Sequence, residues 1–199
     1  MTPDGRIVLA SASPRRLELL RSLGLQVEVL PSGYNEPEMP GLLPAKLATS
    51  HAAAKLESAI ALLGARYDAP VLAADTVVDC DGAALGKPRD AAAAARMLER
   101  LSGREHLVHT AFALGVPGLP PHVECATTRV WFYQLEPGEI AEYVATGEPM
   151  DKAGAYGIQG RSAALVERID GDFYTVMGLP LSRVVRAMRR LGFTLPKTK

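Results

Sequence analysis

Two consecutive arginines, Arg15 and Arg16, stand at the predicted start of a helix, where electrostatics disfavours cations. The segment LASASPRRLELL indicates a strand that runs into a helix, with Ser13 suited to the N-cap and Pro14 to the first helical position. Because a helix N-terminus carries roughly half a positive charge, each cation there costs about 0.3–1 kcal/mol. The same N-terminus binds anions through its free backbone N–H groups. Two interpretations follow: a phosphate site to which Ser11 adds a hydroxyl, or arginines that extend into water.

A single carboxylate, Asp75, interrupts the apolar run LAADTVV at residues 72–78. A buried ionised carboxylate without partners is very unfavourable. Asp75 must therefore meet a cation, a metal or a hydrogen-bond network, or lie where its strand opens into a cleft. It is a candidate metal ligand or general base, because both roles need a carboxylate whose surroundings set its pKa. The alternative is a structural aspartate that closes a turn.

Three further charged residues are weaker candidates. Lys87 lies in the loop GKPRD, where the proline stiffens the backbone beside the carboxylate strand. Lys55 belongs to an otherwise small and apolar helix face, and Glu36 lies in an irregular loop. Most lysines and glutamates are solvated surface residues, so none of these three identifies a site by itself.

The segment GEPMDKAGAYGIQG, residues 147–160, contains too many glycines for an ordinary helix or strand. Gly154, Gly157 and Gly160 allow positive φ angles and a close approach of the backbone to a ligand. The segment matches neither a P-loop nor the dinucleotide-binding fingerprint. The amide of Gln159 offers a donor beside an acceptor, which suits the O4 and N3–H edge of uracil or thymine. A bond from this amide to the loop backbone is an equally good explanation.

The composition limits the classes of partner. The 199 residues include 48% hydrophobic and 22% charged residues, and the formal net charge is zero. A globular chain of this kind has no overall positive field for nucleic acid or an anionic membrane, so any anion site must be local. Cys80 and Cys125 form neither a metal-type spacing nor a disulfide framework, which favours a reducing compartment. Without a signal peptide or an apolar run of about 18 residues, we expect a cytoplasmic protein.

Hydrophobic periodicity predicts alternating strands and helices around these residues. We expect strands at 6–11, 26–30, 105–115 and 122–134, a hairpin that turns at 81–82, and two short strands after residue 160. We expect helices at 14–24, 44–66 and 91–101, one after residue 137, and a last one that packs its leucine and valine face between 181 and 191. Residues 32–43 are predicted to form an irregular loop. This order predicts an α/β or α+β protein with a mixed sheet.

Taken together, the segments LASASPRRLELL, AADTVV, GKPRD, ARMLERLSGREHLVHT and GEPMDKAGAYGIQGR resemble the Maf family, over about residues 6–191. The resemblance implies hydrolysis of a nucleoside triphosphate to the monophosphate and pyrophosphate, with Mg²⁺ or Mn²⁺. It implies an α/β fold like that of the inosine triphosphate pyrophosphatases, in which helices flank a curved mixed sheet and a central cleft separates two lobes. It also implies one Maf-like domain over residues 1–199 and a homodimer.

The resemblance assigns roles to individual residues. Five positions match substrate-binding residues of the family: Ser11, Arg15, Arg16, Thr76 and Gln159. Asp75 matches the proposed catalytic base, and Lys55 and Lys87 match residues that hold phosphate charge. Glu36 and Asp75 match metal positions, and many members carry a second acid beside the first of these. Here the neighbouring residue is not acidic, which makes Glu38 a candidate substitute.

The resemblance also bears on the substrate. Arg16, Thr76 and Gln159 together resemble the subgroup that acts on dTTP and UTP, whereas the subgroup that prefers 7-methyl-GTP has glutamate in place of this glutamine. Two alternatives stay open. One is a pyrophosphatase for modified purine nucleotides, and the other is a nucleotide-binding regulator of septum formation that needs no turnover. Whether Asp75 is a general base or only a metal ligand also stays open.

Overall fold

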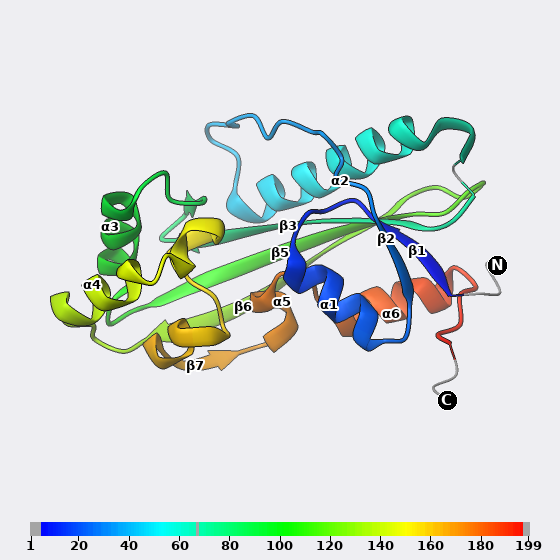
Figure 1. Ribbon diagram of the computed structural model, residues 1–199. Coiled ribbons are helices and arrows are strands. Elements are labelled where there is room, and N and C mark those ends of the chain that lie inside the picture. Colours follow the sequence, from blue (N-terminus) through cyan, green and yellow to red (C-terminus); the bar gives the residue numbers. More distant parts are fainter. Residues whose placement is uncertain (1–4, 67, 197–199) are drawn as a thin grey trace.

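The computed structural model describes residues 5–66 and 68–196, which form a mixed seven-stranded sheet flanked by helices (Figure 1). The strands are β1 (Arg6–Leu9), β2 (Gln26–Val29), β3 (Val71–Cys80), β4 (Ala83–Leu85), β5 (Glu105–Gly115), β6 (His122–Phe132) and β7 (Val166–Asp170). The α-helices are α1 (Pro14–Ser22), α2 (Pro44–Leu63), α3 (Ala91–Leu101), α4 (Pro137–Ala145), α5 (Phe173–Met177) and α6 (Leu181–Arg190). The 3-10 turns are η1 (Gly64–Arg66), η2 (Glu148–Asp151), η3 (Ala153–Ala155) and η4 (Gly160–Leu165). The expected α/β class with a mixed sheet is confirmed.

Strand β3 lies at the centre of the sheet, in the order β2-β1-β3-β5-β6-β7. Antiparallel β5 occupies one edge of β3 along residues 71–79. The other edge is shared, because parallel β1 pairs with residues 71–72 and antiparallel β4 pairs with residues 78–80. Residues 73–77 therefore lie in a gap between β1 and β4. Asp75 and Thr76 fall in this gap, so side chains from both faces of β3 can reach one opening.

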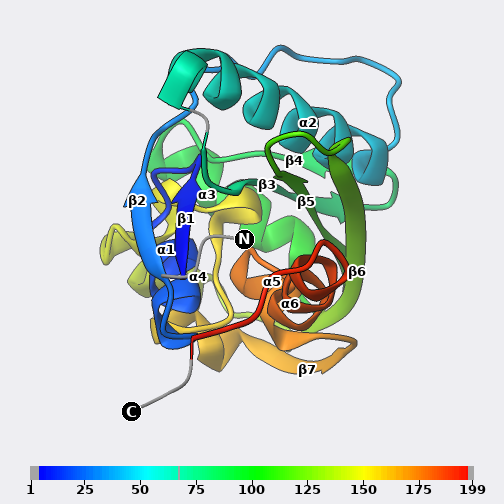
Figure 2. The same ribbon diagram turned by 90° about the vertical axis from the view of Figure 1, so that its right-hand side faces the viewer.

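Helices cover both faces of the sheet near β1 (Figure 2). Small residues of α2, such as Ala48 and Ala52, pack against Ala73 and Ala111 and let the helix approach β3 and β5 closely. The opposite face packs against α1 and α6 through a leucine-rich cluster that includes the fully buried Phe112. Alternation along β3 sends Ala74 to this second face.

A separate core lies at the other end of the long strands, where α3 and α4 pack on β3, β5 and β6 (Figure 1). It gathers Leu98, Leu101, Phe132 and Tyr156 with side chains of the segment 150–165. The strands β3, β5 and β6 thus connect two lobes, as expected from the fold class. Among the described residues, no helix combines the length and the apolar character needed to cross a membrane.

Several sequence expectations need correction. One strand and one helix, β7 and α5, follow residue 160 in place of two short strands. Helix α5 forms because the Asp172 carboxylate accepts hydrogen bonds from the N–H and the hydroxyl of Thr175, and Gly178 ends it at φ +112°. Helix α2 ends at Leu63 and a 3-10 turn follows. The Ser13 side chain makes no capping bond; its backbone N–H donates to Ser11 Oγ at 3.2 Å instead.

Candidate active site

A cleft of about 1270 Å³ opens between the lobes at the gap in the sheet. It is bounded by the start of α1, the loop 31–43, one face of α2, the exposed edge of β3, the loop around residue 87 and the segment 151–159. All nine residues predicted from the sequence line this one cleft: Ser11, Arg15, Arg16, Glu36, Lys55, Asp75, Thr76, Lys87 and Gln159. Glu38, the candidate substitute for Glu36, lines it as well.

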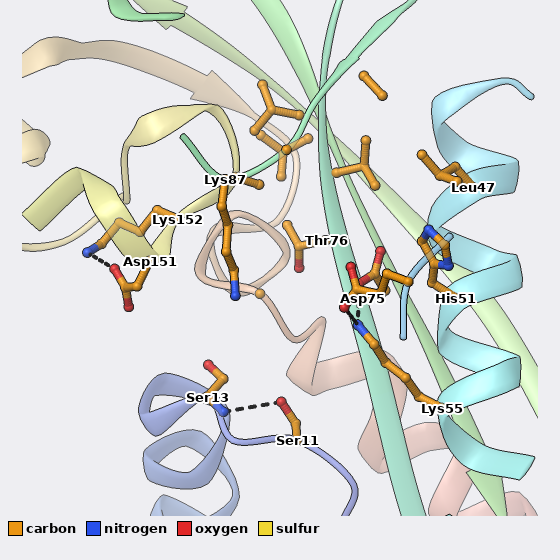
Figure 3. A pocket seen from close by; sticks show the side chains of 18 of the residues that line it. Ser11, Ser13, Leu47, His51, Lys55, Asp75, Thr76, Lys87, Asp151 and Lys152 are labelled. Carbon is orange, nitrogen blue, oxygen red and sulfur yellow. Dashed lines mark hydrogen bonds and ion pairs between the residues drawn. The ribbon is translucent and has the colours of Figure 1, made fainter. Parts of the chain in front are cut away.

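Asp75 of β3 contacts Lys55, which comes from the helix α2 that covers this face of the sheet (Figure 3). The Lys55 ammonium extends from α2 and donates to Asp75 Oδ1 at 2.6 Å, and it forms an ion pair with Glu36 Oε1 at 2.6 Å. Asp75 is 6% exposed, so this contact provides the compensation that a buried carboxylate requires. Partial burial acts to raise the pKa of Glu36, but the hydrogen bond and charge of Lys55 outweigh it, so this pKa lies below its usual range.

The same two carboxylates offer oxygen ligands of the kind that Mg²⁺ and Mn²⁺ prefer. Each oxygen lies 2.6 Å from Lys55 Nζ, so the distance between Glu36 Oε1 and Asp75 Oδ1 is at most twice 2.6 Å. Within the described part of the chain, no three histidine, cysteine, aspartate or glutamate side chains gather to hold a metal by themselves. The donor set therefore fits an ion that takes its remaining ligands from substrate oxygens and water.

The structure separates the two arginines at the start of α1. Arg16 is half-buried, and its guanidinium donates to Gly178 O at 2.8 Å and Ala74 O at 2.8 Å. It also donates to the hydroxyls of Ser11 at 3.0 Å and Thr76 at 3.1 Å. Burial lowers the pKa of Arg16 from its ordinary value, although the nearby Asp75 opposes this effect. Arg16 thus ties α1 to β3 and to the end of α5 across the gap in the sheet.

Arg15 turns the other way and reaches the second lobe. Its guanidinium donates to Asp151 Oδ2 at 3.1 Å, and Lys152 Nζ donates to Asp151 Oδ1 at 2.7 Å. Partial burial acts to raise the pKa of Asp151, and the bonds and charges of Lys152 and Arg15 outweigh it and lower this pKa. Lys87 extends into the open cleft (Figure 3), and no residue of the described chain gives its ammonium a hydrogen bond or ion pair. The cleft therefore carries a surplus of positive charge.

The glycine-dense segment forms one wall of the cleft. Gly154 has φ +66° and packs so closely that an added Cβ would lie 2.9 Å from Val78. Its N–H donates to Gly86 O at 3.0 Å and joins the segment to the loop of Lys87. The side chain of Gln159 is exposed, and its amide makes no hydrogen bond within the described residues. The alternative in which this amide bonds the loop backbone is therefore not observed.

Comparison with known proteins now decides the family. The family model described as Maf-like protein matches residues 6–191, nearly the whole chain.

This chain belongs to the Maf-like protein family.

Two relatives show how similar this Maf-like protein is to curated members. It is 51% identical over 188 residues to the dTTP/UTP pyrophosphatase of Moorella thermoacetica, covering 94% of this chain and 95% of the relative. It is 50% identical over 187 residues to the dTTP/UTP pyrophosphatase of Thermus thermophilus, again covering 94% and 95%. Among solved structures it resembles the Ham1 protein of Staphylococcus aureus, with a TM-score of 0.50 and 15% identity over 90% of this chain and 97% of that one. The last likeness shows the fold alone.

Sequence reasoning does not find Lys152, which lines the cleft of this Maf-like protein, or Thr110, which contacts the cleft residue Thr76. Lys152 lines the cleft, and its ammonium also donates to Glu148 O at 2.5 Å. Its place in MDKAGAYG beside a predicted ligand loop is the signal that could have found it. Thr110 Oγ1 lies 2.9 Å from Thr76 Oγ1 and donates to Thr175 O at 2.7 Å. No local signal marks Thr110, because only the register of β3 and β5 brings it beside Thr76.

Proposed function

We propose that this Maf-like protein hydrolyses dTTP and UTP to the nucleoside monophosphate and pyrophosphate. The observation that carries the proposal is the joining of Asp75 and Glu36 on Lys55 in a cleft that also holds Gln159. The volume of about 1270 Å³ is sufficient for a nucleotide. Relatives of about half identical sequence carry the name dTTP/UTP pyrophosphatase, which supports the same substrates here.

The triphosphate is placed against the positive side of the cleft. Lys87, Arg15 and Lys152 surround this space, and the N-terminus of α1 contributes its dipole. Arg15 and Lys152 both form ion pairs with the Asp151 carboxylate. When the nucleotide binds, its phosphate oxygens take the place of this carboxylate as the partner of the two cations. The separated pyrophosphate carries more charge than the bridging phosphates, and these cations stabilise the charge as it develops.

The nucleophile is a water molecule activated beside Asp75. Lys55 donates to Oδ1 of this carboxylate, which leaves Oδ2 to accept a proton from the water. The water oxygen bonds to the α-phosphorus as the bond to the bridging oxygen of pyrophosphate breaks. Glu36 and Asp75 would hold Mg²⁺ or Mn²⁺, which supplies charge neutralisation at the phosphate oxygens. Asp75 then combines general-base and ligand roles.

Base recognition belongs to Gln159, which lines the cleft and whose exposed amide makes no hydrogen bond within the described residues. A paired hydrogen-bond contact with a base discriminates by about 1–3 kcal/mol. Arg16 and Thr76 line the same cleft, and the Arg16 guanidinium donates to the Thr76 hydroxyl at 3.1 Å, which fixes both side chains for contact with the nucleoside.

The test is a product assay over dTTP, UTP, CTP, ATP, GTP and 7-methyl-GTP with Mg²⁺ or Mn²⁺. We expect monophosphate and pyrophosphate from dTTP and UTP, and none from Asp75→Asn. Monophosphate chiefly from 7-methyl-GTP would favour the purine alternative. Binding of dTTP without turnover under either metal would favour a regulator. Diphosphate and orthophosphate would contradict the proposal.

The resemblance further supports one Maf-like domain over residues 1–199, a homodimer and a cytoplasmic location as proposals. Sedimentation of the purified protein tests the dimer, and fractionation of cells tests the location.

A further inference from the structure

The loop that carries Gln159 is held by the hydroxyl of Ser162, a residue that does not line the cleft. Ser162 is fully buried, with 0% exposure. Its Oγ accepts a hydrogen bond from the N–H of Gly157 at 3.1 Å and lies 2.6 Å from Gly157 O and 3.0 Å from Gln159 O. The hydroxyl has one proton, so it donates to one of these carbonyls at a time. Ser162 thus closes the loop 157–162 on itself.

A carboxylate next to Ser162 holds the same loop. Glu148 Oε2 accepts the backbone N–H of Arg161 at 3.1 Å, and Glu148 Oε1 accepts the hydroxyl of Tyr143 at 3.3 Å. Burial raises the pKa of Tyr143, so this phenol keeps the proton that it donates. Glu148 Oε1 also lies 3.1 Å from Ser162 Oγ. The carboxylate is therefore the common partner of the serine and of the loop backbone.

At two positions the loop lies so close to these groups that a residue larger than glycine would displace them. Gly160 has φ +75°, and a Cβ there would lie 2.9 Å from Glu148 Oε1. A Cβ on Gly157 would lie 3.1 Å from Cε of Lys152, whose ammonium donates to Glu148 O. The backbone on both sides of Gln159 is consequently held, although its own amide has no partner in the described chain.

We propose that Ser162 and Glu148 are specificity-determining positioning residues that hold Gln159 against the base. The inference rests on the proposed function, because it assumes that Gln159 contacts the base. A shift of the backbone would move the amide donor and acceptor of Gln159 out of line with the O4 and N3–H edge of uracil, and the advantage of uracil over cytosine, which presents the opposite donor and acceptor, would be lost. Selection between these bases requires a backbone fixed to within a fraction of an ångström.

The test compares kcat/KM for UTP and CTP, which differ only at the base edge. We expect Ser162→Ala to lower the ratio of UTP to CTP by about five- to tenfold, chiefly through KM for UTP. Glu148→Gln keeps an acceptor for the N–H of Arg161 and should retain most of the ratio, whereas Glu148→Ala should lose it. Hydrogen exchange of residues 157–161 should be faster in Ser162→Ala, at amides that remain protected in the wild type.

Ser102→Ala is the matched control. Ser102 lies in the same lobe, outside the cleft, and its Oγ accepts the backbone N–H of Leu135 at 2.7 Å. This variant should lose stability without changing the UTP-to-CTP ratio. If Gln159→Glu changes the preference while Ser162→Ala and Glu148→Ala leave the ratio at the wild-type value, the positioning role is overturned and the proposed function stands. A wild type that does not release monophosphate, or a Gln159→Glu variant with unchanged preference, overturns both.

Discussion

Lys55 Nζ lies 2.6 Å from Asp75 Oδ1 and joins helix α2, which covers the sheet, to a buried carboxylate of the central strand β3. Both side chains are nearly buried, with 12% and 9% of their surfaces exposed. A buried carboxylate in this position needs a cation to compensate its charge, and the cation needs a rigid element to hold it. The alanine-rich face of α2 provides that element, because it packs closely on β3.

Replacement of Asp75 by asparagine should abolish turnover while leaving nucleotide binding. The amide keeps the shape of the side chain but accepts no proton, so we expect kcat for UTP to fall by at least about 10²-fold. Kd for UTP, measured by calorimetry, should change much less, because Lys87 and Arg15 still face the phosphates. A variant with near-normal kcat would exclude Asp75 as both general base and ligand.

Lys55→Met should destabilise the protein, because it leaves Asp75 buried without its cation. Loss of one partner from such a pair costs about 1–3 kcal/mol in the free energy of unfolding. Lys87→Met is the matched control, since no described residue pairs with Lys87. It should leave the free energy of unfolding within about 0.5 kcal/mol of the wild type and raise KM for UTP. Urea unfolding at pH 7 measures both, and equal stability of the two variants would contradict the assignment.

Arg16→Lys should be far more harmful to stability than Arg15→Lys. A lysine cannot reproduce the planar fork that reaches Gly178 O, Ala74 O and two hydroxyls, so buried acceptors lose their partners. We expect a loss of about 1–3 kcal/mol in the free energy of unfolding for Arg16→Lys. Arg15 makes one half-exposed ion pair with Asp151, so Arg15→Lys should change stability by less than about 1 kcal/mol. Comparable losses in the two variants would contradict this distinction.

His106 should make the protein less stable in mild acid. Burial lowers the pKa of His106 from 6.5 to about 4, and its Nδ1 has no hydrogen-bond partner in the described chain. Below pH 6.5 His106 therefore binds a proton in the unfolded chain but not in the folded chain. The contribution of His106 to the free energy of unfolding is complete above pH 6.5 and is lost as the pH falls toward 4. Between pH 7 and pH 5 this loss is about 2 kcal/mol. Urea unfolding at the two pH values should show a smaller difference for His106→Gln than for the wild type.

The sequence predicts which residues line the site better than it predicts the contacts that these residues make. Asp75 is identifiable because a carboxylate in a buried strand must have a compensating partner, and that reasoning is local. The two arginines are not distinguishable, because adjacent helical positions differ by about 100° and the residue type is the same at both. Which of them turns toward the gap in the sheet depends on Gly178, 162 residues away from Arg16 in the chain. The pairing of Thr76 with Thr110 likewise depends on strand register. Helix α5 escapes prediction because its five residues are too few to show a helical period.

The most direct test of the central claim is hydrolysis of UTP by the wild-type protein in water enriched in oxygen-18, with the products weighed by mass spectrometry. Attack of the water at the α-phosphorus predicts one labelled oxygen in uridine monophosphate and unlabelled pyrophosphate. Label in the pyrophosphate, or formation of uridine diphosphate with labelled orthophosphate, would contradict the placement of the water beside Asp75.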